Sequence, residues 1–317
     1  MGERGIRSRA VSERHGGARF KCEFSASAAT IGEQCAADFD NHRFKEAQVS
    51  CEKGALAGDA ASAYRWGRLL VDNQRPAEAI KFYERAAKGG IAEAALALGV
   101  LYAHGVGVPK NEALSLKWTT EAAKAGNVNA QFMLGTFYAA GEGVPENAQA
   151  ALHWMTKAAE GGYDFAQYWL GQAYLTGLGA PKDLIQAKTW FLKSAQQGNA
   201  KSQWRLARLL AKEGSLDEAI HWYRASAELG FDRSQADLGM AYYLGRGVAV
   251  DYHEAQRWLL KAALQNNGLA KYGLGTMAYD GKGVPQDEAK AKAWFNDACQ
   301  AGFKPGCEAY AHLNQTP

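Results

Sequence analysis

The feature that most constrains the fold is a segment that recurs, with variation, along almost the whole chain. One register advances in steps of 32 or 36 residues and consists of Gly67, Gly99, Gly135, Gly171, Ala207, Gly239 and Gly275. A second register follows steps of the same size and consists of Phe82, Trp118, Trp154, Trp190, Trp222, Trp258 and Trp294. Repetition of this regularity predicts a stack of similar units, each of which buries its apolar surface against its neighbours.

The apolar pattern within each unit indicates two helices joined by a turn. In residues 166–198, apolar side chains recur at helical spacing in two stretches, on either side of Gly177-Leu-Gly-Ala-Pro181. Glycine terminates helices and proline is frequent near their starts, so the segment between the stretches predicts a turn. The first stretch consists of Ala166, Leu170 and Tyr174, and the second of Ala187, Trp190, Phe191 and Ala195.

The glycine inside the first helix of each unit needs a physical reason. Glycine is about 1 kcal/mol less favourable than alanine in a helix interior, yet it recurs at one register. We expect the two helices to cross so closely at Gly171 that a side chain would not fit, with the bulky pair Trp190-Phe191 packed nearby. The one substitution in the register, Ala207, is the next smallest residue.

The combined pattern resembles the Sel-1-like repeat, a relative of the tetratricopeptide repeat. The residues that carry the resemblance include Ala130-Gln-Phe-Met-Leu-Gly135, Tyr138, Gly141-Glu-Gly-Val-Pro145 and Trp154-Met-Thr-Lys-Ala-Ala159. The resemblance covers about residues 59–302, in seven repeats. It implies an all-α, right-handed α/α solenoid (superhelix) of helix-turn-helix repeats, and it implies a scaffold for interactions with other proteins.

The segments outside the repeats have different expected structures. Residues 1–29 predict a disordered basic tail, because this polar stretch has no apolar pattern and its first 21 positions hold six lysines or arginines against two glutamates. Residues 30–58 predict a degenerate N-terminal capping repeat, and residues 303–317 predict a C-terminal capping helix and tail.

Composition excludes several classes of function. The net charge is +3, but the first 21 residues alone carry +4 and the remainder carries −1, so the repeats are not basic and no nucleic-acid partner is expected. No run of 18 apolar residues occurs, which argues against membrane insertion. No secretory signal is visible. We therefore expect a soluble monomer, cytoplasmic by default, with a periplasmic or secreted location as the alternative.

No motif in the chain carries recognisable catalytic or cofactor chemistry. The G-x-G-V turns lack the Lys-Ser/Thr of a phosphate-binding loop, and the seven histidines are scattered without metal-ligand spacing. No nucleophile signature is present. The sequence therefore predicts a protein that is not an enzyme and that has no cofactor and no metal site.

The cysteines raise a second possibility. Cys299 and Cys307 resemble the pair of the secreted, cysteine-rich branch of the Sel-1-like family, where the pair forms a disulfide. Cys35 and Cys51 would then form a second pair and leave Cys22 over. The alternative is small buried thiols in a reducing compartment. The resemblance also implies an alternative function, penicillin-binding-like ligand binding, which would require Ser-x-x-Lys; no serine within the repeats has a lysine three residues later.

The first helices should line the concave groove, as in tetratricopeptide-like superhelices, and one register on them is rich in aromatic residues. Tyr, Trp and Arg dominate binding hot spots, so we expect a peptide or protein partner in this groove. The alternative is that the aromatics pack against the next repeat. If they bind a partner, Trp204 should be partly exposed and should face Tyr168 and Arg208. The predicted partner-binding residues are Tyr64, Arg68, Phe132, Tyr168, Gln172, Trp204, Arg208, Tyr243, Tyr272 and Tyr279.

Overall fold

The computed structural model describes residues 28–315, and within that range the chain forms seventeen helices and no strand. The expected basic tail, residues 1–29, lies outside the described residues except for its last two positions, which belong to the first helix. The helices are α1 (Ala28–Asp40), α2 (Phe44–Ala57), α3 (Ala60–Asp72), α4 (Pro76–Lys88), α5 (Ala92–His104), α6 (Glu112–Lys124), α7 (Val128–Ala140), α8 (Ala148–Glu160), α9 (Asp164–Thr176), α10 (Leu184–Gln196), α11 (Ala200–Glu213), α12 (Leu216–Glu228), α13 (Asp232–Leu244), α14 (Tyr252–Leu264), α15 (Gly268–Asp280), α16 (Glu288–Gln300) and α17 (Lys304–Gln315).

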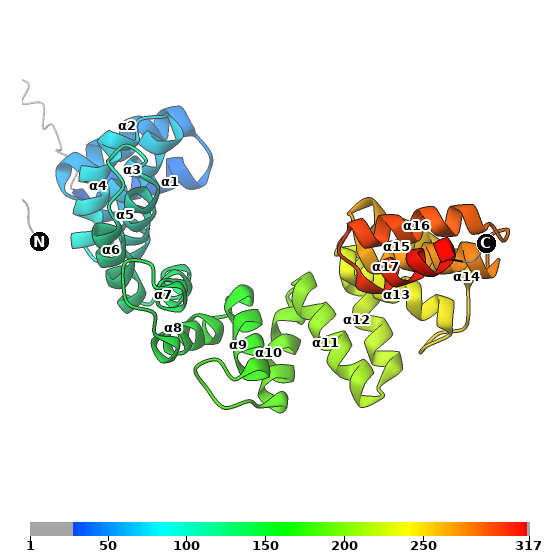
Figure 1. Ribbon diagram of the computed structural model, residues 1–317. Coiled ribbons are helices and arrows are strands. Elements are labelled where there is room, and N and C mark those ends of the chain that lie inside the picture. The colour runs from blue at the N-terminus through cyan, green and yellow to red at the C-terminus, as the bar shows by residue number, and fades with distance from the viewer. Residues whose placement is uncertain (1–27, 316–317) are drawn as a thin grey trace, which may run out of the picture.

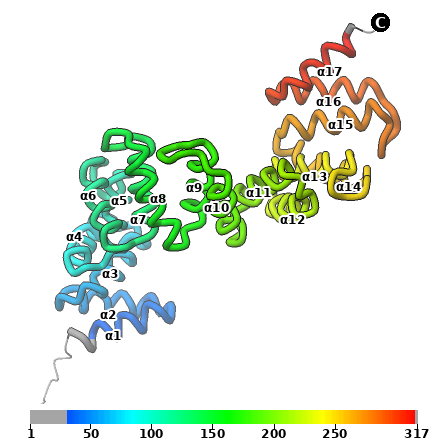
Figure 2. The backbone as a smooth tube through the Cα atoms, turned by 90° about the horizontal axis from the view of Figure 1, so that it is seen from below, coloured from blue at the N-terminus to red at the C-terminus, as the bar shows by residue number. Residues whose placement is uncertain are grey.

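Consecutive helices pair, and the pairs stack in chain order into a curved solenoid (Figure 1). In Figure 2 the two halves of the array are offset from one another, so the stack winds rather than bending in one plane. At the two ends of the array first helices also pack against the next first helix, as α1 does on α3, α13 on α15 and α15 on α17, whereas no two successive second helices of the described residues pack comparably. The first helices are therefore on the inner side of the curve. We call the surface of the odd-numbered helices the inner face.

The glycine register lies where the two helices of a pair cross, as predicted. A Cβ atom built on Gly171 would lie 2.5 Å from Cε1 of Phe191, and Phe191 is fully buried, so it has no room to withdraw. Of the expected pair Trp190-Phe191, it is Phe191 that makes this contact. The equivalent pairs are Gly67 with Tyr83, Gly99 with Thr119, Gly135 with Met155, Gly239 with Leu259 and Gly275 with Phe295.

The turn inside a repeat depends on glycine. Gly177 caps α9 with a φ of 85°, and Gly179 has a φ of 73°, a left-handed conformation that glycine adopts without strain. The next helix, α10, begins after Asp183, whose carboxylate accepts hydrogen bonds from two N–H groups of the first turn. Pro181 therefore lies just before the cap and not inside the helix.

A buried glutamine joins successive repeats, and the sequence interpretation above does not include it. Nε2 of Gln203, on α11, donates to the carbonyl oxygen of Ala195, in the last turn of α10, at 3.1 Å. The carbonyl already accepts from the backbone N–H of Gly198 at 3.0 Å, so the amide is a second donor to it, and such a bond contributes about 1 kcal/mol. The same bond recurs at Gln131, Gln167 and Gln235.

Two disulfides close the two ends of the array. Cys35–Cys51 joins α1 to α2 with Cα atoms 4.5 Å apart, and Cys299–Cys307 joins α16 to α17 with Cα atoms 4.4 Å apart. The expected pairings are therefore confirmed, while Cys22 lies outside the described residues. Each end unit contacts a neighbour on one side only. A disulfide there restricts the unfolded chain, which typically adds about 2–4 kcal/mol of stability.

Candidate functional site

The predicted binding residues all lie on odd-numbered helices, but they differ in exposure. Arg68, Arg208 and Tyr279 are exposed, and Trp204 and Tyr243 are buried. The remainder are half-buried: Tyr64, Phe132, Tyr168, Gln172 and Tyr272. Only part of the predicted set is therefore available to a partner on the inner face.

Trp204 is 5% exposed, so the expectation that this side chain is partly exposed is wrong. Its ring packs against Phe231 with the centroids 5.8 Å apart, and its Nε1 donates a hydrogen bond to Oδ2 of Asp237 at 2.7 Å. Phe231 immediately precedes α13 and Asp237 lies in it. The indole is therefore held between α11 and α13 and links two repeats.

The same kind of contact recurs along the inner face. Ring centroids lie 4.8 Å apart for Phe132 and Tyr163, and 5.5 Å apart for Tyr272 and Phe303. Each partner, like Phe231, directly precedes a first helix of the following unit. The packing alternative thus accounts for part of the aromatic register. Sequence reasoning missed these partners, although an aromatic residue just before a first helix was a visible signal.

Tyr168 is connected to the next repeat by hydrogen bonds. Oε1 of Gln172 accepts from Tyr168 Oη at 3.0 Å and from the Arg205 guanidinium at 2.8 and 3.0 Å. The ring of Tyr168 also packs against Phe191, with the centroids 5.9 Å apart. Since Arg205 belongs to α11, this network crosses from one repeat to the next. Tyr168 and Gln172 are therefore held in fixed positions while remaining half-buried.

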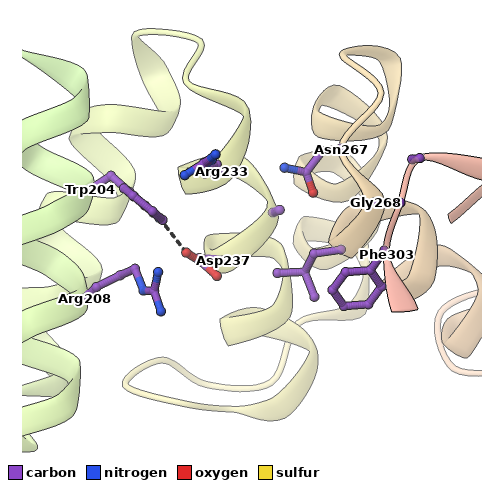
Figure 3. A pocket seen from close by; sticks show the side chains of 11 residues that line it. Trp204, Arg208, Arg233, Asp237, Asn267, Gly268 and Phe303 are labelled. Carbon is purple, nitrogen blue, oxygen red and sulfur yellow. Dashed lines mark hydrogen bonds between the residues drawn. The ribbon is translucent and has the colours of Figure 1, made fainter. Parts of the chain in front are cut away.

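A pocket of about 390 Å³ opens beside Trp204 (Figure 3), and we call it the Trp204 pocket. Arg208 and Arg233 lie on either side of Asp237, and Phe303 faces them from the far side. The walls come from α11, α13, the start of α15 and the residues just before α17. Parts of three successive first helices and the residues that lead into α17 therefore meet at one point of the inner face.

Three guanidinium groups surround the Trp204 ring. The Cζ atoms of Arg205, Arg208 and Arg233 lie 4.7, 5.0 and 5.1 Å from its centroid, within the range of cation–π attraction. Arg205 is bound by Gln172. By contrast, Arg208 and Arg233 form no hydrogen bond and no ion pair with any residue between 28 and 315. Their N–H donors are free to bind a ligand.

The carboxyl group of Asp237 lies among these cations. Burial raises the pKa of Asp237 above its ordinary value, and this effect outweighs the hydrogen bond from Trp204 and the charges of Arg208 and Arg233, which lower the pKa. The carboxyl itself is thus partly shielded from water, whereas the side chains of Arg208 and Arg233 beside it are exposed.

Tyr243 belongs to a different cluster and is engaged inside the protein. Its Oη donates to Oδ2 of Asp280 at 2.5 Å, and Lys282 Nζ lies 5.4 Å from the ring centroid. Burial, reinforced by the bond to Asp280, raises the pKa of Tyr243 to about 12. Tyr279, by contrast, is 43% exposed. Of these two tyrosines, only Tyr279 is presented to a partner.

The ligand-binding alternative gains little from the geometry. The Ser-x-x-Lys spacing occurs outside the repeats, at Ser50 and Lys53 of α2. Ser50 Oγ, however, donates to Oδ2 of Asp38 at 2.8 Å, and Arg43 pairs with the other oxygen of that carboxylate. The hydroxyl is thus engaged by an acid and not by a lysine base.

The described part of the chain has neither a metal-binding cluster nor a helix suited to cross a membrane. Between residues 28 and 315, no group of three or more His, Cys, Asp or Glu side chains is arranged to hold a metal ion. None of the helices in the same range has both the length and the apolar character needed to cross a membrane.

The repeats match a known family. The Sel1 repeat matches seven consecutive segments, residues 55–91, 92–127, 128–163, 164–199, 200–231, 232–267 and 268–303. Two solved structures are similar at 30% sequence identity. A protective antigen of uropathogenic Escherichia coli with an SLR fold has a TM-score of 0.77 over 85% of this chain and 59% of its own. A Sel1 repeat protein from Oxalobacter formigenes has a TM-score of 0.66 over 90% of this chain and 86% of its own.

The matches cover different shares of this chain and of the proteins that it resembles. No curated protein matches the chain, and the chain spans only 59% of the length of the Escherichia coli antigen. The family match, however, covers the helix pairs from α3–α4 to α15–α16 without a gap. The all-α solenoid of helix pairs agrees with both solved structures. The chain therefore belongs to the Sel1 repeat family.

Proposed function

We propose that this protein is a non-enzymatic scaffold that binds a peptide or protein partner along its inner face. Proteins built from Sel1 repeats generally serve as scaffolds for protein interactions. The observation that carries the proposal for this chain is the Trp204 pocket, where two arginines with free donors lie on a rigid apolar support. Such preorganised aromatic and arginine clusters are typical of binding hot spots.

The chemistry of the inner face favours recognition over catalysis. The free cations at the Trp204 pocket, Arg208 and Arg233, stay protonated in proteins and cannot act as general bases. The tyrosine hydroxyls of Tyr168 and Tyr243 are hydrogen-bonded within the protein. These groups suit the recognition of a surface better than proton transfer.

The proposal assigns different roles to the predicted binding residues. Arg68, Arg208, Tyr279 and the half-buried pair Tyr168 and Gln172 would contact the partner directly. The other predicted residues would position the surface from below by packing between repeats: Tyr64, Phe132, Trp204, Tyr243 and Tyr272.

Site-specific photo-crosslinking in the source cell tests the proposal. A photoreactive amino acid is placed at Arg68 or Tyr279 on the inner face, and as a matched control at Leu192 or Leu260, which are exposed on the second helices α10 and α14. We expect a discrete crosslinked partner, identified by mass spectrometry, from the inner positions alone. Crosslinks to one partner from Leu192 or Leu260 only would show that the inner face is not the binding surface.

A further inference from the structure

We propose that the Trp204 pocket binds an acidic side chain, aspartate or glutamate, from a peptide segment of the partner. The inference rests on the proposed function of the inner face and adds the chemistry of what is bound there. It is carried by the two arginines whose donors have no protein acceptor among the described residues and by the shape and charge of the cavity between them.

The two arginines differ from others in this chain. Arg43, Arg75 and Arg257 each form an ion pair with a nearby carboxylate. Arg208 and Arg233 form no such pair, although Asp237 lies between them in Figure 3. Their guanidinium groups are held over the Trp204 ring, so they are positioned without being neutralised. A guanidinium presents a planar set of donors that matches a carboxylate.

The acids near the pocket are already engaged. Oδ2 of Asp237 accepts the hydrogen bond from Trp204 Nε1, and Oδ2 of Asp232 accepts from Asn267 Nδ2 at 2.7 Å. Three arginines surround the indole against the two nearby carboxyl groups of Asp237 and Asp232, so positive charge is in excess by one. A carboxylate brought by a partner would offset that excess, and the exposed guanidinium groups of Arg208 and Arg233 can be reached by it.

Two helix starts add to the preference for an anion. Arg233 lies in the first turn of α13, and Gly268 is the first residue of α15. The N–H groups of a first helical turn have no acceptor within the helix and give this end a partial positive charge. Both helix starts line the pocket wall, so their partial positive charge adds to the positive charge of the guanidinium groups.

The far wall of the pocket limits what can accompany the acid. Leu269 and Phe303 line it, and the ring of Phe303 is fixed by packing against Tyr272. The volume of about 390 Å³ is near the lower end of ligand pockets. The cavity therefore suits one or two side chains of an extended segment, an acidic residue beside an apolar one.

An array of end-blocked nonapeptides tests this preference. Each peptide has a fixed central residue, Glu, Asp, Gln or Asn, and random flanks, and the strongest binders are measured again by fluorescence polarisation with the purified full chain. We expect acidic centres to bind at least about tenfold more tightly than their amide counterparts, because a charge-assisted hydrogen bond contributes roughly that factor. The difference should shrink as salt is added.

Variants locate the binding to the pocket. Arg208→Gln and Arg233→Gln should each weaken the acidic peptide about tenfold, and Asp237→Asn should tighten it, because this change removes a competing negative charge. Arg75→Gln is the control: Arg75 is also an exposed arginine, but it precedes α4, pairs with Glu78 and belongs to no part of the pocket. Its affinity should stay within about twofold of the parent. Thermal melts confirm that each variant is folded.

Several results would overturn the inference. Equal binding of Glu and Gln centres, an equal loss in Arg75→Gln and Arg208→Gln, or binding that requires a free peptide C-terminus would each do so. Absence of any array binder would also count against it. If a partner still crosslinked to the inner face in those cases, the proposed scaffold function would stand and the acidic preference alone would fail.

Discussion

Repeats four and five, residues 164–199 and 200–231, place an aromatic residue at the same register with different results. Tyr168 packs against Phe191 of its own repeat and stays half-buried. Trp204 packs against Phe231, the residue just before α13, and is buried. The equivalent residue before α11 is Asn199, which caps that helix and offers no ring to Tyr168. The residue just before the next first helix therefore determines whether the ring at this register packs against an aromatic partner from the following unit.

The two repeats also differ at the helix crossing. Repeat four has Gly171 against Phe191, whereas repeat five has Ala207, which is fully buried in one cluster with Tyr223. A methyl group is thus tolerated at one crossing and excluded at the other. Positions that are equivalent in the sequence pattern are under different steric limits in the folded chain.

Trp204→Ala should have the largest effect on stability, about 3–5 kcal/mol, because it removes a buried ring and leaves Asp237 without its hydrogen-bond donor. Tyr168→Ala is the control and should lose clearly less, since Tyr168 is half-buried. Urea denaturation of both variants measures the free energies of unfolding. Similar losses would mean that the two aromatics play the same role and that the comparison is wrong.

Gly171→Val should have the next largest effect on stability, a loss of about 3 kcal/mol of unfolding free energy through overpacking. The built Cβ already approaches Phe191 too closely, and valine adds two methyl groups to it. The matched change Gly143→Ala lies in a turn where the nearest atom to the built Cβ is 3.7 Å away, so any loss there reflects its positive φ and not a clash. A Gly171→Val chain that unfolds at the same urea concentration as the parent would exclude a close crossing.

Asp237→Asn should change how stability depends on pH. Burial raises the pKa of Asp237 in the folded chain, so the parent is favoured below the unfolded pKa and loses stability as pH rises through the ordinary aspartate range toward the folded pKa. Asparagine keeps an acceptor for Trp204 Nε1 and cannot ionise. The difference in unfolding free energy between variant and parent should therefore move in favour of the variant between acid and neutral pH. Parallel curves for the two proteins would contradict the raised pKa.

Much of the fold could be predicted from spacing within one repeat. The contact of Gly171 with Phe191 depends on residues of a single helix pair, and the turn at Gly177 depends on local backbone conformation. The contact and the turn were predictable because a local pattern is sufficient to specify each of them. The disulfide pairs also join neighbouring helices, but they were expected from the resemblance to the cysteine-rich branch of the family.

The candidate site was harder to predict because it depends on how repeats are placed on one another. Trp204 is buried by Asp237, which lies in the next unit. The pocket further requires Phe303, beyond the last repeat's helices, to reach the same point. The register identified Trp204 and Arg208 correctly as members of one surface. It could not tell which side chain the neighbouring repeat would cover.

Ala207→Gly should have the smallest effect, a loss of about 1 kcal/mol or less, because it removes one methyl group and introduces a glycine into a helix interior. The change makes the crossing of repeat five like that of repeat four at this position. Repeat five has Tyr223 in place of Phe191 and a shorter link between α11 and α12, so the helices are not expected to move closer and recover the loss. Gly171→Ala is the reciprocal variant and should lose more than Ala207→Gly, since its added Cβ meets a fully buried ring. Urea denaturation of the pair gives both values. A larger loss for Ala207→Gly than for Gly171→Ala would show that helix propensity, and not the closeness of the crossing, explains the glycine register.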